Sequence, residues 1–355
     1  MQKTVIMVWC KTDSGTHPNG SVKTYGLGDF LRGTICLHQM SVQLGFKFVV
    51  DLRLHPISRF LIMKKHDHME YVNANMNKMQ IVNCHEPYKF NIVYNASLRN
   101  DEPLLICTNM FCNNELSTDC KQFMRKLLTQ NESFKNYISQ QNALYNVSSP
   151  YSIMHIRLGD DEFFENKTAN VSNIAAATKL IKEHAVPTDI LMSNSYRLKE
   201  YVRSLNVNVT MFDTRPVHLG ELSTMFRKNI ADSFKETLYE FFTLGNASEI
   251  KTCSVYEWVS GFVKFASVIY DIPLIDLKQL QMKQMQNQTQ LNKMQLNKMQ
   301  LNKMQLTQMQ LNQMQLNKMQ LNKMQLNKMY LKQMQLNKMQ PQQMHLKQMQ
   351  LNQTQ

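Results

Sequence analysis

Short apolar runs alternate with helical stretches along the first part of the chain. A run at 5–10 is followed by a glycine-containing loop at 20–28, a helix predicted by apolar periodicity over 29–44, and a second run at 46–52. Two strands joined by a helix form a βαβ unit, which pairs its strands in parallel. Three shorter apolar runs and a long helical stretch follow, at 79–83, 90–94, 104–108 and about 119–144.

From Tyr151 the alternation becomes regular. Strands are predicted at 151–158, 189–193, 207–212, 249–253 and 272–277, with helices between them at 172–184, 196–204, 233–244 and 257–270. This order predicts a doubly wound parallel sheet with right-handed crossovers, in which ligands bind beyond the carboxyl ends of the strands. The sequence thus predicts an α/β protein with one domain over 1–148 and a second over 149–277.

Residues 278–355 follow a different pattern. From about Gln290 the chain repeats every five residues, as in Gln290-Leu291-Asn292-Lys293-Met294. Five residues of helix advance about 500°, or about 140° past a full turn, so successive leucines never share a face. On a strand the odd period puts alternate leucines on opposite sides, and a pentapeptide solenoid needs a small residue where this chain has Met. We therefore expect a low-complexity, disordered tail.

Lysines of this tail account for most of the net charge. Lys and Arg number 40 against 27 Asp and Glu, a formal charge of +13, but 11 lysines and no acidic residue lie after residue 277. The charge therefore does not predict specific nucleic-acid binding, and only weak attraction of the tail to anionic surfaces is expected. The apolar runs are too short for a bilayer span of ~20 residues or for a signal peptide, which predicts a soluble, cytoplasmic protein.

Seven cysteines are scattered along the chain without the paired C-x-x-C spacing of structural zinc sites. Their odd number argues against a disulfide framework. We expect reduced thiols and no metal site.

The most informative segment runs from Ile153 to Glu162 and reads I-M-H-I-R-L-G-D-D-E. His155 and Arg157 lie two residues apart on a predicted strand, so they project to the same face near its carboxyl end. A central parallel strand is covered on both faces, so an arginine there needs an anionic partner. Two interpretations stay open: an internal pair of Arg157 with Asp160 or Asp161, and an arginine that binds a substrate phosphate.

A second candidate follows the predicted strand 249–253. Ser254-Val255-Tyr256-Glu257 fits the S/T-x-x-E capping box and predicts the start of the helix over 257–270. Helix amides at this edge of the sheet are candidates for phosphate binding, and plain capping is the alternative.

The third candidate is a G-x-G turn, Gly26-Leu27-Gly28, which opens a helix with Asp29 and Arg32 in its first turns. A dinucleotide fingerprint would need a third glycine where the chain has Leu31. No D-x-D, phosphate-binding P-loop or G-x-S-x-G sequence occurs, which excludes several nucleotide and hydrolase sites and favours chemistry without metal.

Together these segments resemble the fucosyltransferase superfamily of glycosyltransferases. Residues 155–160 are similar to the H-x-R-x-G-D motif of α-1,2-fucosyltransferases and of their α-1,6 and protein O-fucosyltransferase relatives. Residues 26–32 are similar to the amino-terminal G-x-G-N loop, 192–195 to the S-D-x segment, and 252–259 to the S-x-F-S-W-W box. The chain departs from these patterns at Asp29, which replaces Asn, at Leu158, which replaces a second Arg, and in the last box, which keeps one Trp.

The resemblance implies a GT-B-like fold of two Rossmann-like domains, GDP-fucose as donor, a glycan acceptor and inverting transfer without metal or cofactor. It implies that Arg157 holds the β-phosphate and that Asp160 or Asp161 accepts the proton of the acceptor hydroxyl or orients the sugar, with Glu221 and Glu240 as weaker candidates. The implied substrate-binding residues are Gly26, Gly28, Asp29, Arg32, His155, Ser193, Ser254 and Glu257. Another nucleotide sugar, and a non-catalytic scaffold that acts through the basic tail, remain as alternatives.

Overall fold

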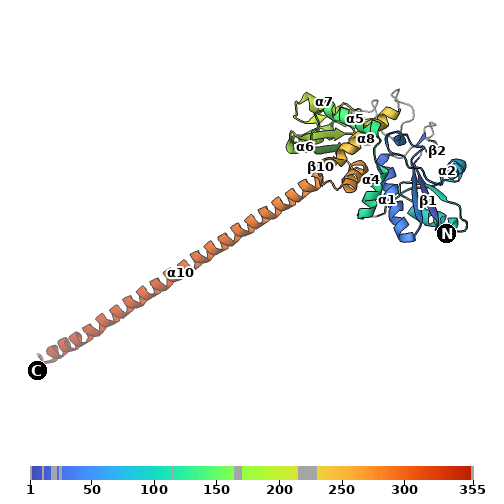
Figure 1. Cartoon of the computed structure of the whole chain (residues 1–355). Coiled ribbons are helices and arrows are strands. Elements are labelled where there is room, and N and C mark those ends of the chain that lie inside the picture. Colours follow the sequence, from blue (N-terminus) through green and yellow to red (C-terminus); the bar gives the residue numbers. More distant parts are fainter. Residues whose placement is uncertain are drawn as a thin grey trace. The chain divides into compact units, whose positions relative to one another are not determined.

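The computed structural model describes residues 2–9, 12–16, 22–23, 26–112, 115–163, 170–214 and 230–352. Contacts divide the chain into two units, Met1–Leu280 and Gln281–Gln355. The first unit holds two sheets of parallel strands and a small antiparallel pair, β2 (Thr12–Thr16) and β3 (Val22–Lys23) (Figure 1). The predicted α/β class is confirmed for this unit.

The first sheet has the strand order β4-β1-β6-β5. Its strands are β1 (Thr4–Val8), β4 (Lys47–Asp51), β5 (Gln80–Val82) and β6 (Leu104–Thr108). Between them run α1 (Leu27–Leu44), η1 (Pro56–Phe60), α2 (Met69–Asn75), η2 (Met76–Lys78) and α3 (Pro87–Ser97). Val5 to Val8 of β1 are fully buried, as expected of a central parallel strand, which explains the continuous apolar run in the sequence.

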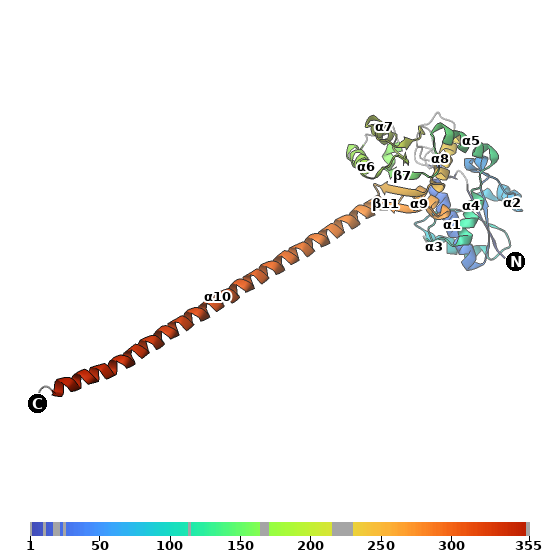
Figure 2. The same cartoon turned by 60° about the vertical axis from the view of Figure 1, so that its left-hand side comes forward.

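The second sheet has the order β11-β10-β7-β8-β9, with β7 in the centre (Figure 2). Its strands are β7 (Ser152–Arg157), β8 (Asp189–Ser193), β9 (Thr210–Met211), β10 (Glu249–Ser254) and β11 (Leu274–Asp276). Its helices are η3 (Asp160–Phe163), α6 (Val171–His184), α7 (Tyr196–Ser204), α8 (Ile230–Gly245) and α9 (Gly261–Tyr270). Arg157 pairs in register with Ser254, and Ile156 with Ser193, so β7, β8 and β10 end at one edge of the sheet.

Two predicted stretches differ from the structure. The long helix expected over 119–144 is divided into α4 (Thr118–Leu127) and α5 (Glu132–Leu144). Asn131 accounts for the break, because its side chain caps α5 by accepting the N–H of Phe134 at 2.9 Å. The apolar run at 90–94 lies within α3, which begins at Pro87.

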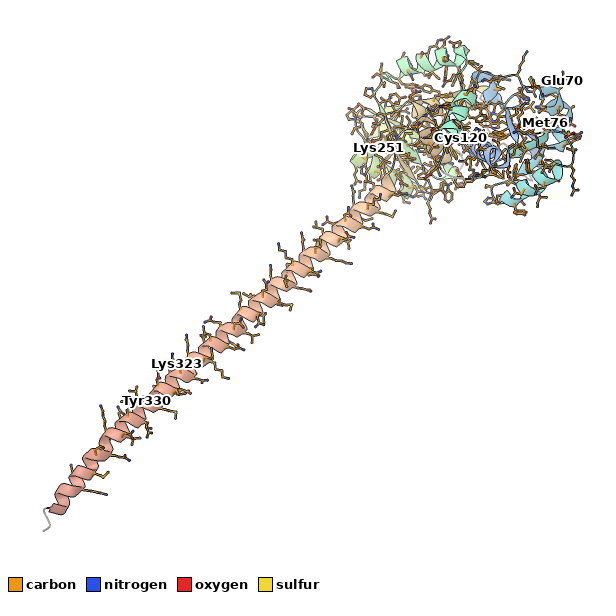
Figure 3. The ribbon with its side chains drawn as sticks, turned by 60° about the horizontal axis from the view of Figure 1, so that its bottom comes forward. Glu70, Met76, Cys120, Lys251, Lys323 and Tyr330 are labelled. Atoms are coloured by element: carbon orange, nitrogen blue, oxygen red, sulfur yellow. A yellow bond between two sulfur atoms is a disulfide. The ribbon has the colours of Figure 1, made fainter. Side chains whose placement is uncertain are left out.

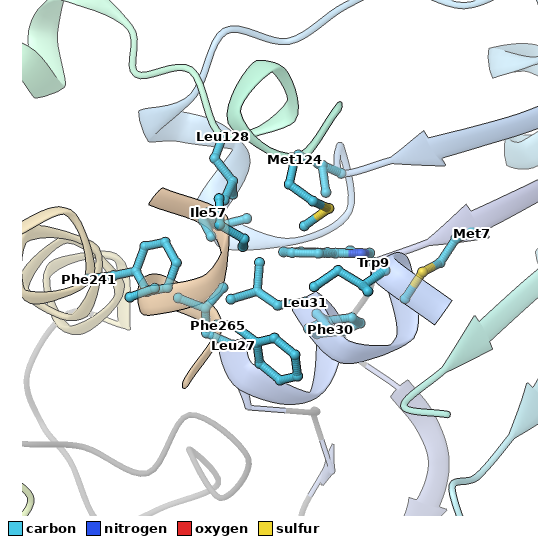
Figure 4. Close-up of a cluster of buried hydrophobic side chains, with 14 of the residues drawn as sticks. Met7, Trp9, Leu27, Phe30, Leu31, Ile57, Met124, Leu128, Phe241 and Phe265 are labelled. Carbon is cyan, nitrogen blue, oxygen red and sulfur yellow. The ribbon is translucent and has the colours of Figure 1, made fainter. Parts of the chain in front are cut away.

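Helices from the C-terminal part of the first unit pack on helices from its N-terminal part. α8 contacts η1, and α9 contacts both α1 and α4. Figure 4 shows Phe241 of α8 and Phe265 of α9 gathered with Leu27 and Leu31 of α1 and with Ile57 of η1. All five side chains are buried in one apolar cluster that continues into the first sheet and reaches the second. This cluster holds the start of α1 beside the start of α9.

Residues 281–352 of the second unit are helical, which corrects the expectation of a disordered tail. These residues belong to α10 (Leu277–Asn352), a continuous helix with Pro341 inside it. Leu, Gln, Lys and Met are good helix formers, and the element far exceeds the roughly 12–15 residues below which isolated helices are marginal. The predicted lack of a buried face is confirmed, because every described side chain from Met282 on is exposed. Figure 3 shows Lys323 and Tyr330 extending outward from the helix.

None of the helices in the described ranges combines the length and the apolar character that crossing a membrane requires.

Candidate active site

A pocket of about 540 Å³ lies within the first unit, where the carboxyl ends of β7 and β8 meet the amino-terminal ends of α1 and α9. Its position follows the rule for ligands of parallel sheets. The pocket is lined by seven of the residues singled out in the sequence as site candidates: Gly26, Gly28, Asp29, Arg32, His155, Arg157 and Ser193. Residues from both sequence regions that carry the resemblance therefore meet in one cavity.

Arg157, the last residue of β7, places its guanidinium at this pocket. Its side chain is 19% exposed and forms an ion pair with Asp160 of η3. The carbonyl of Arg157 accepts the N–H of Val255 at 2.9 Å, which fixes the strand end against β10. Burial lowers the pKa of Arg157 and the charge of Asp160 opposes that shift. Arginine nevertheless stays protonated at neutral pH, so the pocket has a permanent cation.

His155 lies on the same face of β7, as predicted from its spacing. Its Nδ1 is 3.3 Å from the Thr252 hydroxyl on the neighbouring strand β10. Burial, and then the charge of Arg157, lower the pKa of His155 to about 3. The imidazole is therefore neutral at physiological pH and can donate or accept a hydrogen bond without adding charge.

Asn194 holds the turn that follows Arg157. Its side-chain carbonyl accepts the N–H of Leu158 at 2.7 Å, and its amide donates to the carbonyls of Leu158 and Gly159 at 3.2 and 3.1 Å. Ser195 donates from its hydroxyl to Glu162 at 2.6 Å and accepts the N–H of Leu198, which caps α7. The segment after β8 thus positions the Gly159-Asp160 turn, a role that its residue types alone did not reveal.

The N-termini of α1 and α9 approach each other closely. A Cβ on Gly28 would lie 3.1 Å from the Phe262 nitrogen and 3.2 Å from the Gly261 carbonyl carbon, so only glycine fits without displacement. No side chain caps either helix: Gly26, which precedes α1, has no side chain, and Ser260, which precedes α9, makes no capping hydrogen bond. Helix N-termini carry partial positive charge and N–H groups that favour anions.

Two further cations stand at this junction. Arg32 is paired with Asp29 at 2.7 Å, and Lys264 lies over the Phe111 ring at 5.2 Å from its centroid. Burial lowers the pKa of Lys264, and the positive charge of Arg32 lowers it further. The sequence did not predict Lys264 as a site residue, because only the docking of α9 on α1 brings it to the pocket.

Four predicted site residues do not line the pocket. Asp160 and Asp161 are exposed in η3, which follows Arg157. The capping box is wrong: α9 begins at Gly261, and the Ser254 hydroxyl instead accepts the N–H of Tyr256 at 3.2 Å. Glu257 is exposed in the segment before the helix.

Of the two weaker carboxylate candidates, Glu240 and Glu221, only Glu240 lies among the described residues. Glu240 lines the pocket, accepts a hydrogen bond from the Thr214 hydroxyl at 2.5 Å and lies 3.8 Å from the buried ammonium of Lys199. These partners engage its carboxylate, which favours a positioning role. Glu221 lies outside the described residues.

The cysteines also require a correction. Cys36 of α1 and Cys112 form a disulfide across 76 residues of sequence, where reduced thiols were expected. The bond ties α1 to the segment that carries Phe111, a pocket residue. Cys84, Cys120 and Cys253 are free thiols, and Cys10 lies outside the described residues. Over the described ranges, no group of three His, Cys, Asp or Glu side chains is arranged to hold a metal ion.

No family model matches the sequence, and no curated protein matches it significantly. Solved structures similar to the chain include three fucosyltransferases. Bradyrhizobium NodZ is 11% identical with a TM-score of 0.46, and the match covers 76% of this chain and 94% of NodZ. An Arabidopsis thaliana FUT1 mutant in complex with GDP is 11% identical with a TM-score of 0.46, and the match covers 77% of this chain and 70% of FUT1. POFUT1 in complex with GDP is 9% identical with a TM-score of 0.38, and the match covers 77% of this chain and 98% of the POFUT1 chain.

Two buried histidines predict acid destabilisation. Burial lowers the pKa of His55 to about 4, and that of His155 to about 3, both below the usual 6.5. Between these values and 6.5 the unfolded chain takes up protons that the folded chain refuses, so stability is complete above pH 6.5 and falls below it. Each histidine contributes a slope of up to about 1.4 kcal/mol per pH unit.

We therefore expect the melting temperature to decrease from pH 7 to pH 5, as followed by circular dichroism. His55→Asn should flatten this dependence, because an Asn oxygen can replace Nδ1 as acceptor of the Ile57 N–H. His85→Gln, at an exposed position, is the matched control. Identical pH slopes for the wild type and His55→Asn would contradict the assignment.

Proposed function

We propose that this chain is a metal-independent, inverting fucosyltransferase that transfers fucose from GDP-fucose to a glycan hydroxyl, in the manner of the α-1,2-fucosyltransferases. The observation that carries the proposal is the meeting, in one pocket, of Arg157 from an H-x-R-x-G-D sequence with two helix N-termini and two more cations. The volume of about 540 Å³ is typical of small-molecule sites.

Charge in the pocket suits a diphosphate leaving group. When a nucleotide sugar breaks down, positive charge grows on the sugar and negative charge on the diphosphate, so stabilising the diphosphate lowers the barrier. Arg157, Arg32 and Lys264 line the pocket and supply positive charge. The Nε of Arg32 is also buried without a hydrogen-bond partner among the described residues, which supports an anionic ligand there.

Asp160 is the proposed acceptor of the proton, with Asp161 as second candidate. Asp160 pairs with Arg157 and is exposed, so an incoming acceptor can reach it. As Arg157 engages the β-phosphate of the donor, the Asp160 carboxylate becomes available as a base. The acceptor oxygen then bonds to the anomeric carbon from the side opposite the diphosphate. The bond from that carbon to the β-phosphate oxygen breaks, GDP leaves with the electron pair, and the acceptor proton moves to Asp160.

Nucleotide binding and release test this function directly. We expect calorimetry of the full chain to show binding of GDP and none of UDP. With a panel of glycans, GDP release should occur with GDP-fucose, and EDTA should not reduce the rate. Preference for UDP or for another sugar would instead favour a different glycosyltransferase. Absence of any nucleotide binding would favour a scaffold that acts through the basic helix α10.

A further inference from the structure

Trp258 is an exposed aromatic residue at the edge of the pocket. Its side chain is 66% exposed and lines the cavity, whereas Trp9, the other tryptophan, is fully buried. Tryptophan is a large side chain that is highly buried on average, so one this exposed beside a cavity marks a contact surface.

The indole of Trp258 is held in a fixed orientation. It stacks on the ring of Tyr256, with centroids 5.1 Å apart and planes 8° from parallel. Tyr256 is itself anchored, because its hydroxyl accepts the N–H of Asp160 at 3.2 Å and its carbonyl accepts a hydrogen bond from Lys278 at 3.0 Å. Tyr256 therefore covers one face of the indole and leaves a flat aromatic surface that needs no reorganisation to bind a ligand.

We infer that Trp258 is the platform for a pyranose ring of the acceptor glycan; this inference rests on the proposed function. The face of an indole carries negative charge density, which attracts the weakly positive C–H groups on the apolar face of a pyranose. A flat, rigid ring also loses little conformational entropy on binding.

The surroundings favour the acceptor over the nucleotide base. Trp258 is linked through Tyr256 to Asp160, the proposed base, so a sugar stacked on the indole lies on the side of the pocket where the proton is removed. The exposed carboxylate of Glu257, between the two aromatic residues in sequence, can accept hydrogen bonds from sugar hydroxyls. In a nucleotide sugar the diphosphate separates the nucleobase from the sugar that is transferred. A bound nucleobase would therefore lie away from Asp160.

Intrinsic fluorescence tests the platform without turnover. With only two tryptophans and Trp9 buried, a ligand that covers Trp258 should shift its emission to shorter wavelength. We expect this shift on titration of the full chain with lactose, N-acetyllactosamine or diacetylchitobiose, and not for Trp258→Phe. If none of these three sugars changes the emission at millimolar concentration, the inference is wrong, whatever the nucleotide assays show.

Kinetics separate acceptor from donor binding. Trp258→Ala should raise the KM for the glycan at least 10-fold, because stacking on the indole contributes most of the contact between Trp258 and the sugar. Trp258→Phe should raise it less, because phenylalanine keeps an aromatic ring. GDP affinity should change much less than the glycan KM in both variants. Tyr201→Ala, at an exposed aromatic residue of α7 that does not line the pocket, is the control. A loss of GDP affinity without a change in glycan KM would assign the indole to the nucleotide base and overturn the inference. Failure of the proposed function would instead appear in the wild type, as absence of turnover of GDP-fucose.

Discussion

Arg157→Ala is expected to abolish fucosyl transfer while leaving the protein folded. The guanidinium is the cation at the carboxyl end of the central strand, and no other residue of β7 can replace its charge. Loss of one preorganised donor to a developing anion costs about 10²–10³-fold in rate, and loss of a full charge at a diphosphate costs at least as much. Arg157→Lys should recover part of the activity, because lysine keeps the charge without the two-pronged hydrogen-bonding geometry. Steady-state GDP release measures both variants.

The fold should survive because the Arg157 side chain lies at the end of its strand and its ion-pair partner, Asp160, is exposed to water. Melting temperature and circular dichroism should therefore remain close to those of the wild type. Arg203→Ala is a matched control, since Arg203 also pairs with an exposed aspartate, Asp213, but lies on α7 away from the pocket. Undiminished turnover of purified Arg157→Ala would show that this arginine does not hold the leaving group.

The centre of the site could be predicted from sequence because two local rules determine it. Alternation along a strand puts His155 and Arg157 on one face, and parallel strands end at a common edge, which brings Ser193 close to them. Both rules need only the order and spacing of apolar runs, and the structure places all three residues at the pocket.

Residues outside these rules depend on tertiary contacts. Lys264 and Trp258 reach the pocket because α9 starts at Gly261 and docks on α1, whereas the capping-box pattern placed that start at Glu257. Cys36 and Cys112 are far apart in sequence and meet only after α1 has packed on the first sheet. No local periodicity encodes such contacts.

In the repeat region, unlike at the pocket, the pattern of apolar residues did not predict the secondary structure. Its period of five residues correctly excluded a buried face, but the absence of a buried face does not decide between coil and helix. Intrinsic preference decides there, and Leu, Lys, Gln and Met all favour the helix. For such segments the residue types predict more than the pattern does.

Gly28→Val should weaken GDP binding by about 10-fold or more, because small displacements of binding groups have large effects on a preorganised site. A Cβ at position 28 would press on the Gly261 and Phe262 backbone, and the additional methyl groups of valine force the starts of α1 and α9 apart. Arg32 and Lys264, one on each helix, would then no longer face the same anion. Overpacking of this kind also costs typically about 1–3 kcal/mol of stability. Calorimetry with GDP and a thermal melt measure the two effects.

Gly26→Ala is the control in the same turn. Its Cβ would lie 3.8 Å from the Asp29 carboxylate, an ordinary contact, and the backbone there (φ −64°, ψ 159°) suits any residue. Gly28→Ala should fall between the two, since its single methyl requires a shift of only a few tenths of an ångström. If all three variants bind GDP equally well, the junction of α1 and α9 does not form the diphosphate site. A graded loss that follows the size of the side chain at position 28, with Gly26→Ala unaffected, is the result that only a site built across both helix N-termini explains.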